Sequence, residues 1–255
     1  MSKLVYIVGA GPGNPDLITV KGDRLLREAD LVVYAGSLVN KKLLERVKEG
    51  CNIYDSAGMD LEEICKVMIE YAEAGKKVVR LQSGDPSIYG ALREQMGLLA
   101  EANIACAMVP GVSSFSAAAA AVGKEYTLPE ISQTIILTRQ AGRTPVPEEQ
   151  ALGSLAKHGA SMAIFLSISM IDKVIDELRQ GYSEETPVAV VYKASWQEEQ
   201  VIEGTIADIS GKVKAAGLKL SALILVGPFL GDPISRSKLY DAGFTHGCRE
   251  GKSCG

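Results

Sequence analysis

A glycine-rich loop, Val8–Pro15, follows the first apolar run of the chain. Main-chain N–H groups in such a loop can approach a phosphate closely, as they do in dinucleotide-binding proteins. That fingerprint needs a third glycine or alanine that opens a helix, yet Asn14 stands there and Pro15 disfavours helical geometry before it. It also needs an acidic residue about 20 residues further on, where the chain has Tyr34–Ser37. The loop predicts a close approach to another ligand or a tight turn without one, and we expect no nicotinamide or flavin site.

Two more turns follow apolar runs that we interpret as strands. Gly84-Asp85-Pro86 comes after Lys77–Leu81, and Pro110–Ser114 comes after Ala105–Val109. Ligands of open α/β sheets bind at the carboxyl ends of strands, where glycine lets the main chain approach them closely. The aspartate of the first turn is placed to bind a cofactor, to face a substrate, or only to cap its own turn. The serines of the second turn would contact a cofactor or cap the helix that follows.

Several larger side chains could contact a ligand. Arg139 and Arg143 follow a predicted strand, and an arginine fork suits a carboxylate, although a solvated surface position is the alternative for both. Tyr34 and Tyr89 could flank a flat ring or belong to the core. We expect Trp196 at the rim of a cleft or at a contact between two copies. The chain has two histidines and no Ser–His or Cys–His pattern, which favours a reaction without covalent catalysis.

The elements that must position these residues alternate between short apolar runs and amphipathic helical patterns. This alternation predicts an α/β fold with mostly parallel sheets. We predict two α/β domains, residues 1–123 and 124–233, linked through Gly123–Glu130 and followed by a polar tail, 234–255. The clearest helix is Leu61–Ala74, and the loop Arg143–Glu149 is expected to lead into another. The expected strands are Lys3–Gly9, Leu31–Tyr34, Asn52–Tyr54, Lys77–Leu81, Ala105–Val109, Thr134–Thr138, Met162–Leu166, Val188–Tyr192, Val201–Ile206 and Ala222–Val226.

Composition excludes several classes of function. The net charge of −4 disfavours a general nucleic-acid binder. No apolar run reaches the length of about 18 residues that a membrane span needs. The five cysteines are odd in number and widely spaced, so we expect reduced thiols and a cytoplasmic protein. His246, Cys248 and Cys254 match no standard zinc spacing, so we expect no metal site.

Seven motifs occur in a fixed order along the chain. They are Val8–Thr19, Ser83–Gly90, Val109–Ser114, Ile164–Ser167, Pro187–Ser195, Glu203–Ile206 and Leu223–Gly227. Together they resemble the tetrapyrrole (corrin/porphyrin) methylases over nearly the whole chain. The resemblance implies two α/β domains with S-adenosylmethionine in the cleft between them, S-adenosylhomocysteine as product, a tetrapyrrole substrate and, usually, a homodimer.

The resemblance also implies roles for individual residues. Those expected to bind the cofactor are Pro12, Gly84, Asp85, Ile88, Ser113, Ser114, Leu166 and Ala189. Those expected to act in catalysis are Asp85 and Tyr89, and those expected to bind the substrate are Ser37, Arg93, Arg139 and Arg143. Methyl transfer from a sulfonium is an in-line displacement, so positioning in a dry cleft can supply several kcal/mol of the barrier.

Two stretches narrow the substrate. Tyr34–Val39 and Ser237–His246 are similar to the methylases that act at C-11 of precorrin-4 or its cobalt form. Ala91 stands where uroporphyrinogen-III methylases typically have arginine, which counts against that substrate. We therefore expect methylation at C-11. The alternatives are another precorrin position or uroporphyrinogen-III, a diphthine synthase that modifies a protein, and a non-catalytic nucleotide-binding module.

Overall fold

Five apolar runs in the first half of the chain form a fully parallel sheet in the order β3-β2-β4-β1-β5. The computed structural model describes residues 3–231, 241–245 and 247–250. The strands are β1 (Leu4–Gly9), β2 (Leu31–Tyr34), β3 (Asn52–Asp55), β4 (Val78–Gln82) and β5 (Ala105–Val109). β2 and β4 are buried along their whole length, as expected of strands covered on both faces.

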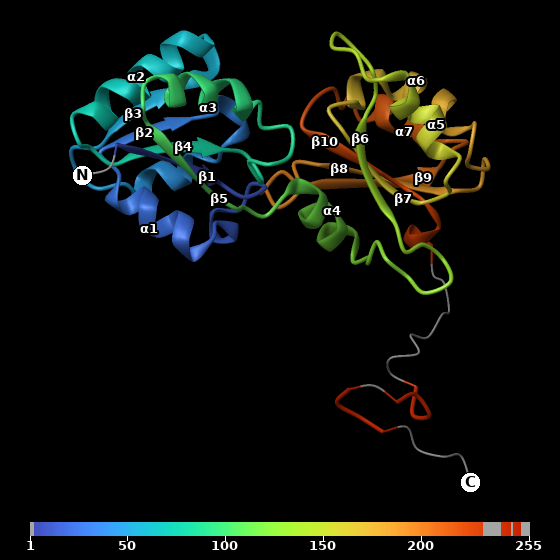
Figure 1. Ribbon diagram of the computed structural model, residues 1–255. Helices are drawn as coiled ribbons and strands as arrows, with labels where there is room; N and C mark the ends of the chain where they lie inside the picture. Colours follow the sequence, from blue (N-terminus) through green and yellow to red (C-terminus); the bar gives the residue numbers. More distant parts are fainter. Residues whose placement is uncertain (1–2, 232–240, 246, 251–255) are drawn as a thin grey trace. The chain divides into compact units, whose positions relative to one another are not determined.

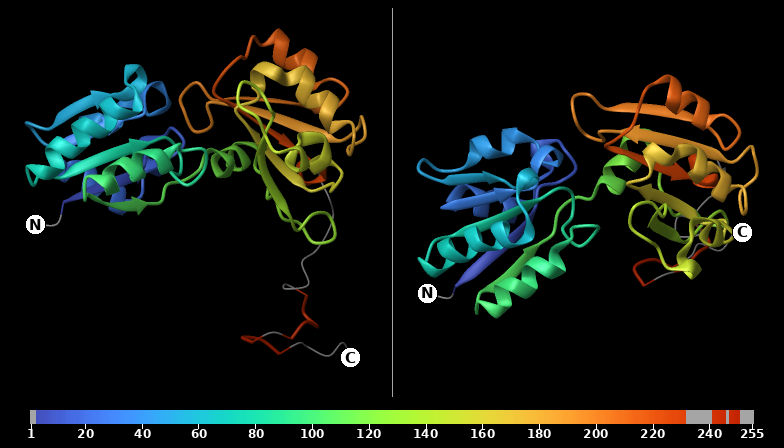
Figure 2. Two further views of the ribbon diagram at one scale, coloured as in Figure 1. Left: turned by 45° about the horizontal axis from the view of Figure 1, so that its top comes forward. Right: turned by 90° about the horizontal axis from the view of Figure 1, so that it is seen from above.

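Helices cover both faces of this sheet (Figures 1 and 2). α1 (Val20–Glu28) begins at Thr19, whose hydroxyl accepts a hydrogen bond from the Gly22 N–H at 3.1 Å. On the opposite face lie α2 (Leu61–Glu73), which begins with a capping box of Asp60 and Glu63, and α3 (Leu92–Glu101). Short 3-10 helices are η1 (Pro15–Leu17), η2 (Gly36–Leu38), η3 (Lys41–Arg46) and η4 (Ser56–Gly58).

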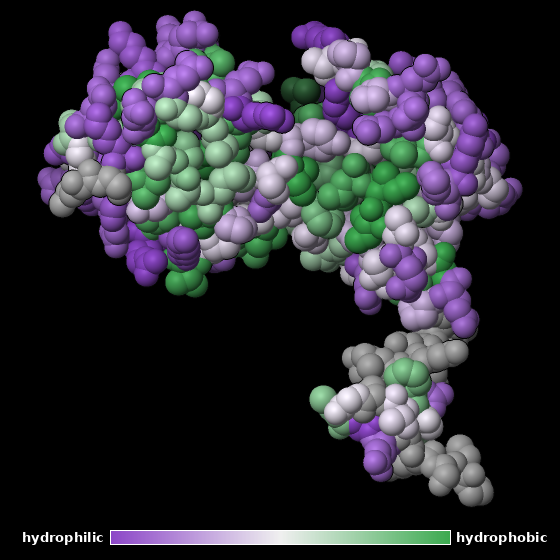
Figure 3. Space-filling view, in the orientation of Figure 1, coloured by the Kyte–Doolittle hydropathy of each residue, from purple (hydrophilic) through white to green (hydrophobic). Residues whose placement is uncertain are grey.

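β5 forms one edge of the first sheet, next to β1. Its residues are partly exposed, and Met108 is 42% exposed. Figure 3 shows hydrophobic surface over the part of the molecule where β5 lies, with hydrophilic residues beside it. This edge therefore presents apolar side chains that no described helix covers completely.

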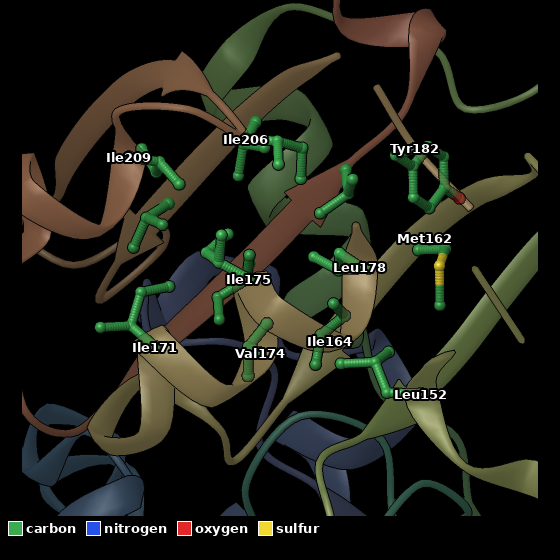
Figure 4. Packing of buried hydrophobic residues seen from close by; sticks show 14 of the residues in the cluster. Leu152, Met162, Ile164, Ile171, Val174, Ile175, Leu178, Tyr182, Ile206 and Ile209 are labelled. Atoms are coloured by element: carbon green, nitrogen blue, oxygen red, sulfur yellow. The ribbon is translucent and has the colours of Figure 1, made fainter. Parts of the chain in front are cut away.

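The second half forms another five-stranded sheet, in the order β6-β7-β10-β8-β9. Its strands are β6 (Ile135–Arg139), β7 (Ser161–Phe165), β8 (Pro187–Tyr192), β9 (Gln200–Thr205) and β10 (Ala222–Val226). Its helices are α5 (Leu152–Ala156), α6 (Ile171–Leu178) and α7 (Ile209–Ala215), with short η5 (Glu148–Gln150), η6 (Ile168–Met170) and η7 (Pro228–Leu230). The helices α5, α6 and α7 bury one face of the sheet in a core that includes Met162, Ile164, Val174 and Ile209 (Figure 4).

Strand direction differs between the two sheets. Only β6 and β7 are parallel in the second sheet, whereas β10 runs antiparallel to β7 and β8, and β8 antiparallel to β9. Across both sheets, five of the eight described pairings are parallel. The pair β8 and β9 is antiparallel because a short loop joins the two strands directly, which a parallel pair does not allow.

Contacts divide the chain into two compact units. Unit 1 comprises Met1–Ala117 and Lys193–Glu199, and unit 2 comprises Ala118–Tyr192 and Gln200–Gly255. The loop between β8 and β9 thus belongs to unit 1. The predicted division of the chain after residue 123 assigns this loop to the second domain instead. The boundary near residue 117 falls inside α4 (Ser114–Val122). In the described part of the chain, no helix has the length and apolar character needed to cross a bilayer.

Candidate active site

Three glycines bring the ends of β1, β4 and β5 together in unit 1. A Cβ on Gly9 would lie 2.6 Å from the Cα of Gly111 and 2.7 Å from the carbonyl oxygen of Gly84. A Cβ on Gly111 would lie 2.2 Å from the same oxygen. These separations leave no room for any side chain, so both positions require glycine. The three loops are packed main chain against main chain.

The loops after β1 and β4 are also hydrogen-bonded to each other. The Gly84 N–H donates to the Gly11 carbonyl at 2.8 Å, and the Gly11 N–H donates to the Gly84 carbonyl at 3.3 Å. β1 leads into α1 on one face of the sheet and β4 leads into α3 on the other. Strands whose connections leave in opposite directions mark the usual ligand site of an open α/β sheet. Gly84 has a φ of 62°, and a Cβ there would meet nothing nearer than 3.8 Å, so space remains beside its Cα.

The Asp85 carboxylate joins the loop after β4 to the loop after β5. Its Oδ2 accepts a hydrogen bond from the Gly111 N–H at 2.9 Å, and its Oδ1 accepts from the Ser87 N–H at 2.8 Å and from the Ser87 hydroxyl. Burial raises the pKa of Asp85, but the hydrogen bonds from Ser87 and Gly111 outweigh it and hold the pKa below its ordinary value of 3.8. Both oxygens are engaged within the protein, as in the turn-capping alternative. A direct catalytic role stays a prediction.

The chain between Asp85 and α3 is held in an unusual conformation. Tyr89 and Ala91 have φ values of 52° and 47°, which residues with a side chain adopt only where the surroundings hold them. The side-chain amide of Gln95 donates to the Ala91 carbonyl at 3.2 Å, which fixes one end of this segment. The Ile88 N–H donates to the Asp85 carbonyl at 3.2 Å. Tyr89 is 45% exposed, so its ring lies at the surface of the segment.

The other residues of unit 1 that are predicted to bind the cofactor lie at the same edge of the sheet. Pro12 is buried, and its carbonyl oxygen accepts a hydrogen bond from the indole Nε1 of Trp196 at 2.8 Å. Ser113 is 7% exposed, and its carbonyl accepts from the N–H groups of the first turn of α4, which begins at Ser114. Pro12 thus lies on the loop after β1, and Gly84, Asp85 and Ser113 lie on the loops after β4 and β5, the two strands on either side of β1. The structure brings these four together as the sequence patterns predict.

In unit 2, Leu166 and Ala189 occupy different environments. Leu166 directly follows β7, has a φ of 54° and is 67% exposed, which is unusual for a leucine. Ala189 lies within β8, pairs with Leu225 and Glu203, and is 1% exposed. Leu166 stays a candidate for contact with a ligand, whereas the burial of Ala189 argues against such a contact for its side chain.

The two arginines after β6, Arg139 and Arg143, differ in their contacts. The Arg139 guanidinium donates to the Thr144 carbonyl at 3.1 Å and to the Pro145 carbonyl at 2.7 Å. It therefore holds the loop 140–147 through Nη1 and Nη2. Arg143 lies exposed on that loop, and Arg93 is exposed on α3. That these three arginines bind substrate stays a prediction, and for Arg139 the structure shows a role in holding its own loop.

Ser37 lies in η2, and its side chain is outside the described residues. His246, Cys254 and half of Ser237–His246 are outside them as well. Beside η2, the Tyr34 hydroxyl donates to Asp55 Oδ2 at 2.9 Å, and the Ser56 hydroxyl donates to the Tyr34 carbonyl at 2.8 Å. Tyr34 is 6% exposed, so it belongs to the core and orients its neighbours. Among the described residues, no group of three or more metal-ligating side chains occurs.

Sequence patterns did not indicate two further polar residues. Gln140, after β6, is 4% exposed, and its side-chain oxygen has no hydrogen-bond partner in the described chain. Its N–H donates to the hydroxyl of Ser167, which follows β7, at 2.8 Å. A buried acceptor without a partner is uncommon and needs an explanation, such as a donor on a ligand. Arg80, inside β4, is only 4% exposed.

The family model for Tetrapyrrole (Corrin/Porphyrin) Methylases matches residues 4–210 of the chain. The chain belongs to this family. It is 56% identical over 251 residues to the cobalt-precorrin-4 C(11)-methyltransferase of Methanocaldococcus jannaschii, covering 98% of this chain and 97% of that protein.

Two solved structures of the family are also similar. The X-ray structure of a cobalt precorrin-4 methyltransferase matches with a TM-score of 0.88 and 48% identity, covering 91% of this chain and 97% of the other. The uroporphyrin-III C-methyltransferase of Thermus thermophilus in complex with S-adenosylhomocysteine matches with a TM-score of 0.74 and 27% identity, covering 89% of this chain and 98% of the other. The chain therefore has the fold of the tetrapyrrole methylases.

Proposed function

We propose that the protein transfers the methyl group of S-adenosylmethionine to C-11 of cobalt-precorrin-4 during cobalamin biosynthesis. The observation that carries this proposal is the 56% identity, over 98% of the chain, to a relative named for that reaction. The similar uroporphyrin-III enzyme is only 27% identical. The pattern Tyr34–Val39 and the alanine at Ala91 favour the same substrate.

The strand ends of unit 1 fit a cofactor that is held mainly by main-chain groups. The space beside the Gly84 Cα would admit a ligand atom, and the glycine contacts at Gly9 and Gly111 keep the surrounding loops in fixed positions. We assign cofactor binding to Pro12, Gly84, Ile88, Ser113, Ser114 and Leu166, with Asp85 holding the loops in place. The bound cofactor supplies an electrophilic methyl group on a sulfonium.

The chain's own contribution to catalysis is then positioning. Loops fixed by main-chain contacts and by the Asp85 carboxylate need no reorganisation when the reactants bind, and alignment of donor and acceptor lowers the barrier to in-line transfer. Tyr89, exposed on its constrained segment, is placed to contact the substrate ring. Arg143 and Arg93 are assigned to substrate carboxylates, where a charge-assisted hydrogen bond contributes about 1.5–3 kcal/mol.

We also propose that the protein acts as a homodimer in the cytoplasm. The family resemblance supports the dimer. The four described cysteines, Cys51, Cys65, Cys106 and Cys248, are free thiols, in keeping with a reducing compartment. Light scattering after gel filtration gives the mass in solution, and a monomer would contradict the dimer.

The test of the proposed reaction is a turnover assay with purified tetrapyrroles and S-adenosylmethionine carrying a ¹³C methyl group. Cobalt-precorrin-4 should gain one methyl group, and NMR should place the label at C-11. Metal-free precorrin-4 and uroporphyrinogen-III serve as competing substrates in the same assay. Methylation of uroporphyrinogen-III alone, or label at another carbon, would overturn the proposal.

A further inference from the structure

Trp196 lies on the glycine-rich loop after β1, although it is more than 180 residues away in the sequence. Its indole Nε1 donates to the Pro12 carbonyl at 2.8 Å. Next to it, the Ser195 hydroxyl accepts a hydrogen bond from the Asn14 N–H at 3.0 Å. Both belong to the loop Lys193–Glu199, which counts with unit 1. Two consecutive residues of this loop therefore bind the main chain on both sides of Gly13.

Gly13 shows how closely the indole covers the loop. A Cβ on Gly13 would lie 2.0 Å from the Cδ1 and 2.1 Å from the Nε1 of Trp196. Gly13 does not have a positive φ, so its backbone would accept alanine without strain. The three atoms nearest to such a Cβ all belong to the Trp196 ring, so the ring leaves no room for a side chain at Gly13. From the other side, the Asn40 side-chain amide donates to the Gly13 carbonyl at 2.9 Å.

The loop Lys193–Glu199 is itself held in a strained form. Lys193 and Ser195 have φ values of 46° and 69°, which cost free energy unless other contacts maintain them. The Ser195 N–H donates to the Glu199 carboxylate at 2.5 Å. The Lys193 ammonium lies 3.1 Å from the Glu198 carboxylate and 5.3 Å from the centre of the Trp196 ring. Strain of this kind concentrates at functional sites, and here it aims the indole at Pro12.

We propose that Trp196 is a positioning residue that holds the main chain of Pro12–Asn14 in the conformation that binds the cofactor. The inference rests on the proposed function for the identity of the ligand. The loop after β1 is hydrogen-bonded through Gly11 to Gly84, so a shift of Pro12 would reach the main chain assigned to the cofactor. A residue with only a stabilising role would affect unfolding and leave ligand affinity unchanged.

The first test uses Trp196→Phe, which keeps an aromatic side chain on the loop and removes the N–H donor together with part of the indole. Calorimetric titration with S-adenosylhomocysteine should show an affinity about fivefold weaker, the factor expected for one neutral hydrogen bond. Trp196→Ala should lose more than about tenfold. In turnover, both variants should raise the KM for S-adenosylmethionine more than they lower kcat. The matched control is Gln197→Ala, an exposed neighbour on the same loop, which should bind normally.

The second test is a double-mutant cycle between Gly13→Ala and Trp196→Ala. Gly13→Ala alone should displace the indole and weaken cofactor binding as much as Trp196→Ala does. In the Trp196→Ala background the same alanine meets no ring, so it should add no further loss. Trp196 is the single tryptophan of the sequence, so its fluorescence reports the displacement directly. Gly13→Ala should shift the emission to longer wavelength as the indole becomes hydrated.

The outcomes separate this inference from the proposed function. If the wild-type protein binds cofactor and methylates its substrate while Trp196→Phe and Trp196→Ala bind equally well, the positioning role is wrong and the function stands. Additive losses in the cycle would also overturn it. If the wild-type protein binds no S-adenosylhomocysteine, the proposed function is wrong and this role falls with it. The emission of Gly13→Ala would then still show whether the ring covers Gly13.

Discussion

The Asp85 carboxylate accepts a hydrogen bond from the Gly111 N–H at 2.9 Å and so joins two loops. Asp85 follows β4 and Gly111 follows β5, and these strands are not adjacent in the sheet. β1 lies between β4 and β5 in the sheet, so this bond spans the end of β1. The same carboxylate caps its own turn at Ser87. One ionised side chain thereby fixes the edge at which the cofactor is proposed to bind.

Asp85→Asn should destabilise the protein and weaken cofactor binding, because an amide has one acceptor oxygen where the carboxylate has two. An unsatisfied buried N–H costs about 1–3 kcal/mol. Urea unfolding and calorimetry with S-adenosylhomocysteine measure the two effects. Asp176→Asn, which removes an exposed carboxylate paired with Arg179, is the matched control and should change stability by less than about 0.5 kcal/mol.

The pH dependence of Asp85 follows from its lowered pKa. Because the folded pKa lies below the ordinary 3.8, the carboxylate stabilises the fold fully at pH values above 3.8. This stabilisation is lost as the pH falls through the folded pKa. The stability difference between wild type and Asp85→Asn should therefore be constant near neutral pH and shrink below about pH 4. A difference that grows on acidification would show that the carboxylate is not stabilised as the structure indicates.

Gly111→Ala should prevent folding or destabilise it strongly, because the new Cβ would lie 2.2 Å from the Gly84 oxygen. Main chain lies on both sides of this contact and cannot move aside cheaply. Gly97→Ala is a control that we expect to increase stability. Gly97 lies within α3 with nothing near its Cα, so alanine should stabilise the protein by about 0.5–1 kcal/mol. Equal melting temperatures for the two variants would contradict the packing of the strand ends.

The strands were predictable because apolar runs between glycines and polar helices leave little choice of element. All ten form within one residue of the expected bounds at each end, and the helix Leu61–Ala74 ends one residue earlier than expected. The family was predictable because its motifs are spread in order along the chain. The strand ends therefore place Gly84 and Asp85 where the sequence patterns expect them.

Contacts between distant residues were not predictable in the same way. Nothing in the sequence near Arg139 indicates that the loop returns its Thr144 and Pro145 carbonyls to the guanidinium. The bond from Trp196 to Pro12 likewise joins residues with no local signal in common. Ala189 was predicted from a motif that spans a strand and its loop, and the motif does not say which of its residues is accessible. Such details depend on how loops close, which local patterns do not encode.

The two arginines after β6 should behave differently on substitution. Arg143→Ala should weaken substrate binding by about 1.5–3 kcal/mol, because it removes a charge-assisted contact from an exposed position. Arg139→Ala should instead loosen the loop 140–147 and speed amide hydrogen exchange there. Affinity for S-adenosylhomocysteine should stay within about threefold for Arg143→Ala, and salt should weaken tetrapyrrole binding more than cofactor binding. If Arg143→Ala binds the substrate normally, other residues contact the substrate carboxylates, and Arg93 is the next candidate.

Arg80 is a buried cation that supports the segment carrying Tyr89. Its Nε donates to the Gln95 side-chain oxygen at 3.0 Å and its Nη1 to the Val33 carbonyl at 3.2 Å. Gln95 in turn donates to the Ala91 carbonyl. Burial lowers the pKa of Arg80 to about 10, since no carboxylate among its described partners offsets the loss of water. The charge is therefore retained at neutral pH although its burial costs free energy.

Arg80→Met should destabilise the protein by about 1–3 kcal/mol, because the Gln95 oxygen and the Val33 carbonyl lose their donor while the buried charge is removed. Arg80→Met with Gln95→Leu should regain much of that loss, since apolar groups then replace both partners. The lowered pKa gives a second signature. Between the folded value near 10 and the ordinary 12.5, only the unfolded chain holds the proton, so wild-type stability should rise relative to Arg80→Met as the pH increases. Urea unfolding of the three proteins from neutral pH to above the folded value measures both effects. If the double variant is less stable than Arg80→Met, Arg80 does not support this segment as described. The same holds if the stability of the wild type relative to Arg80→Met falls as the pH rises.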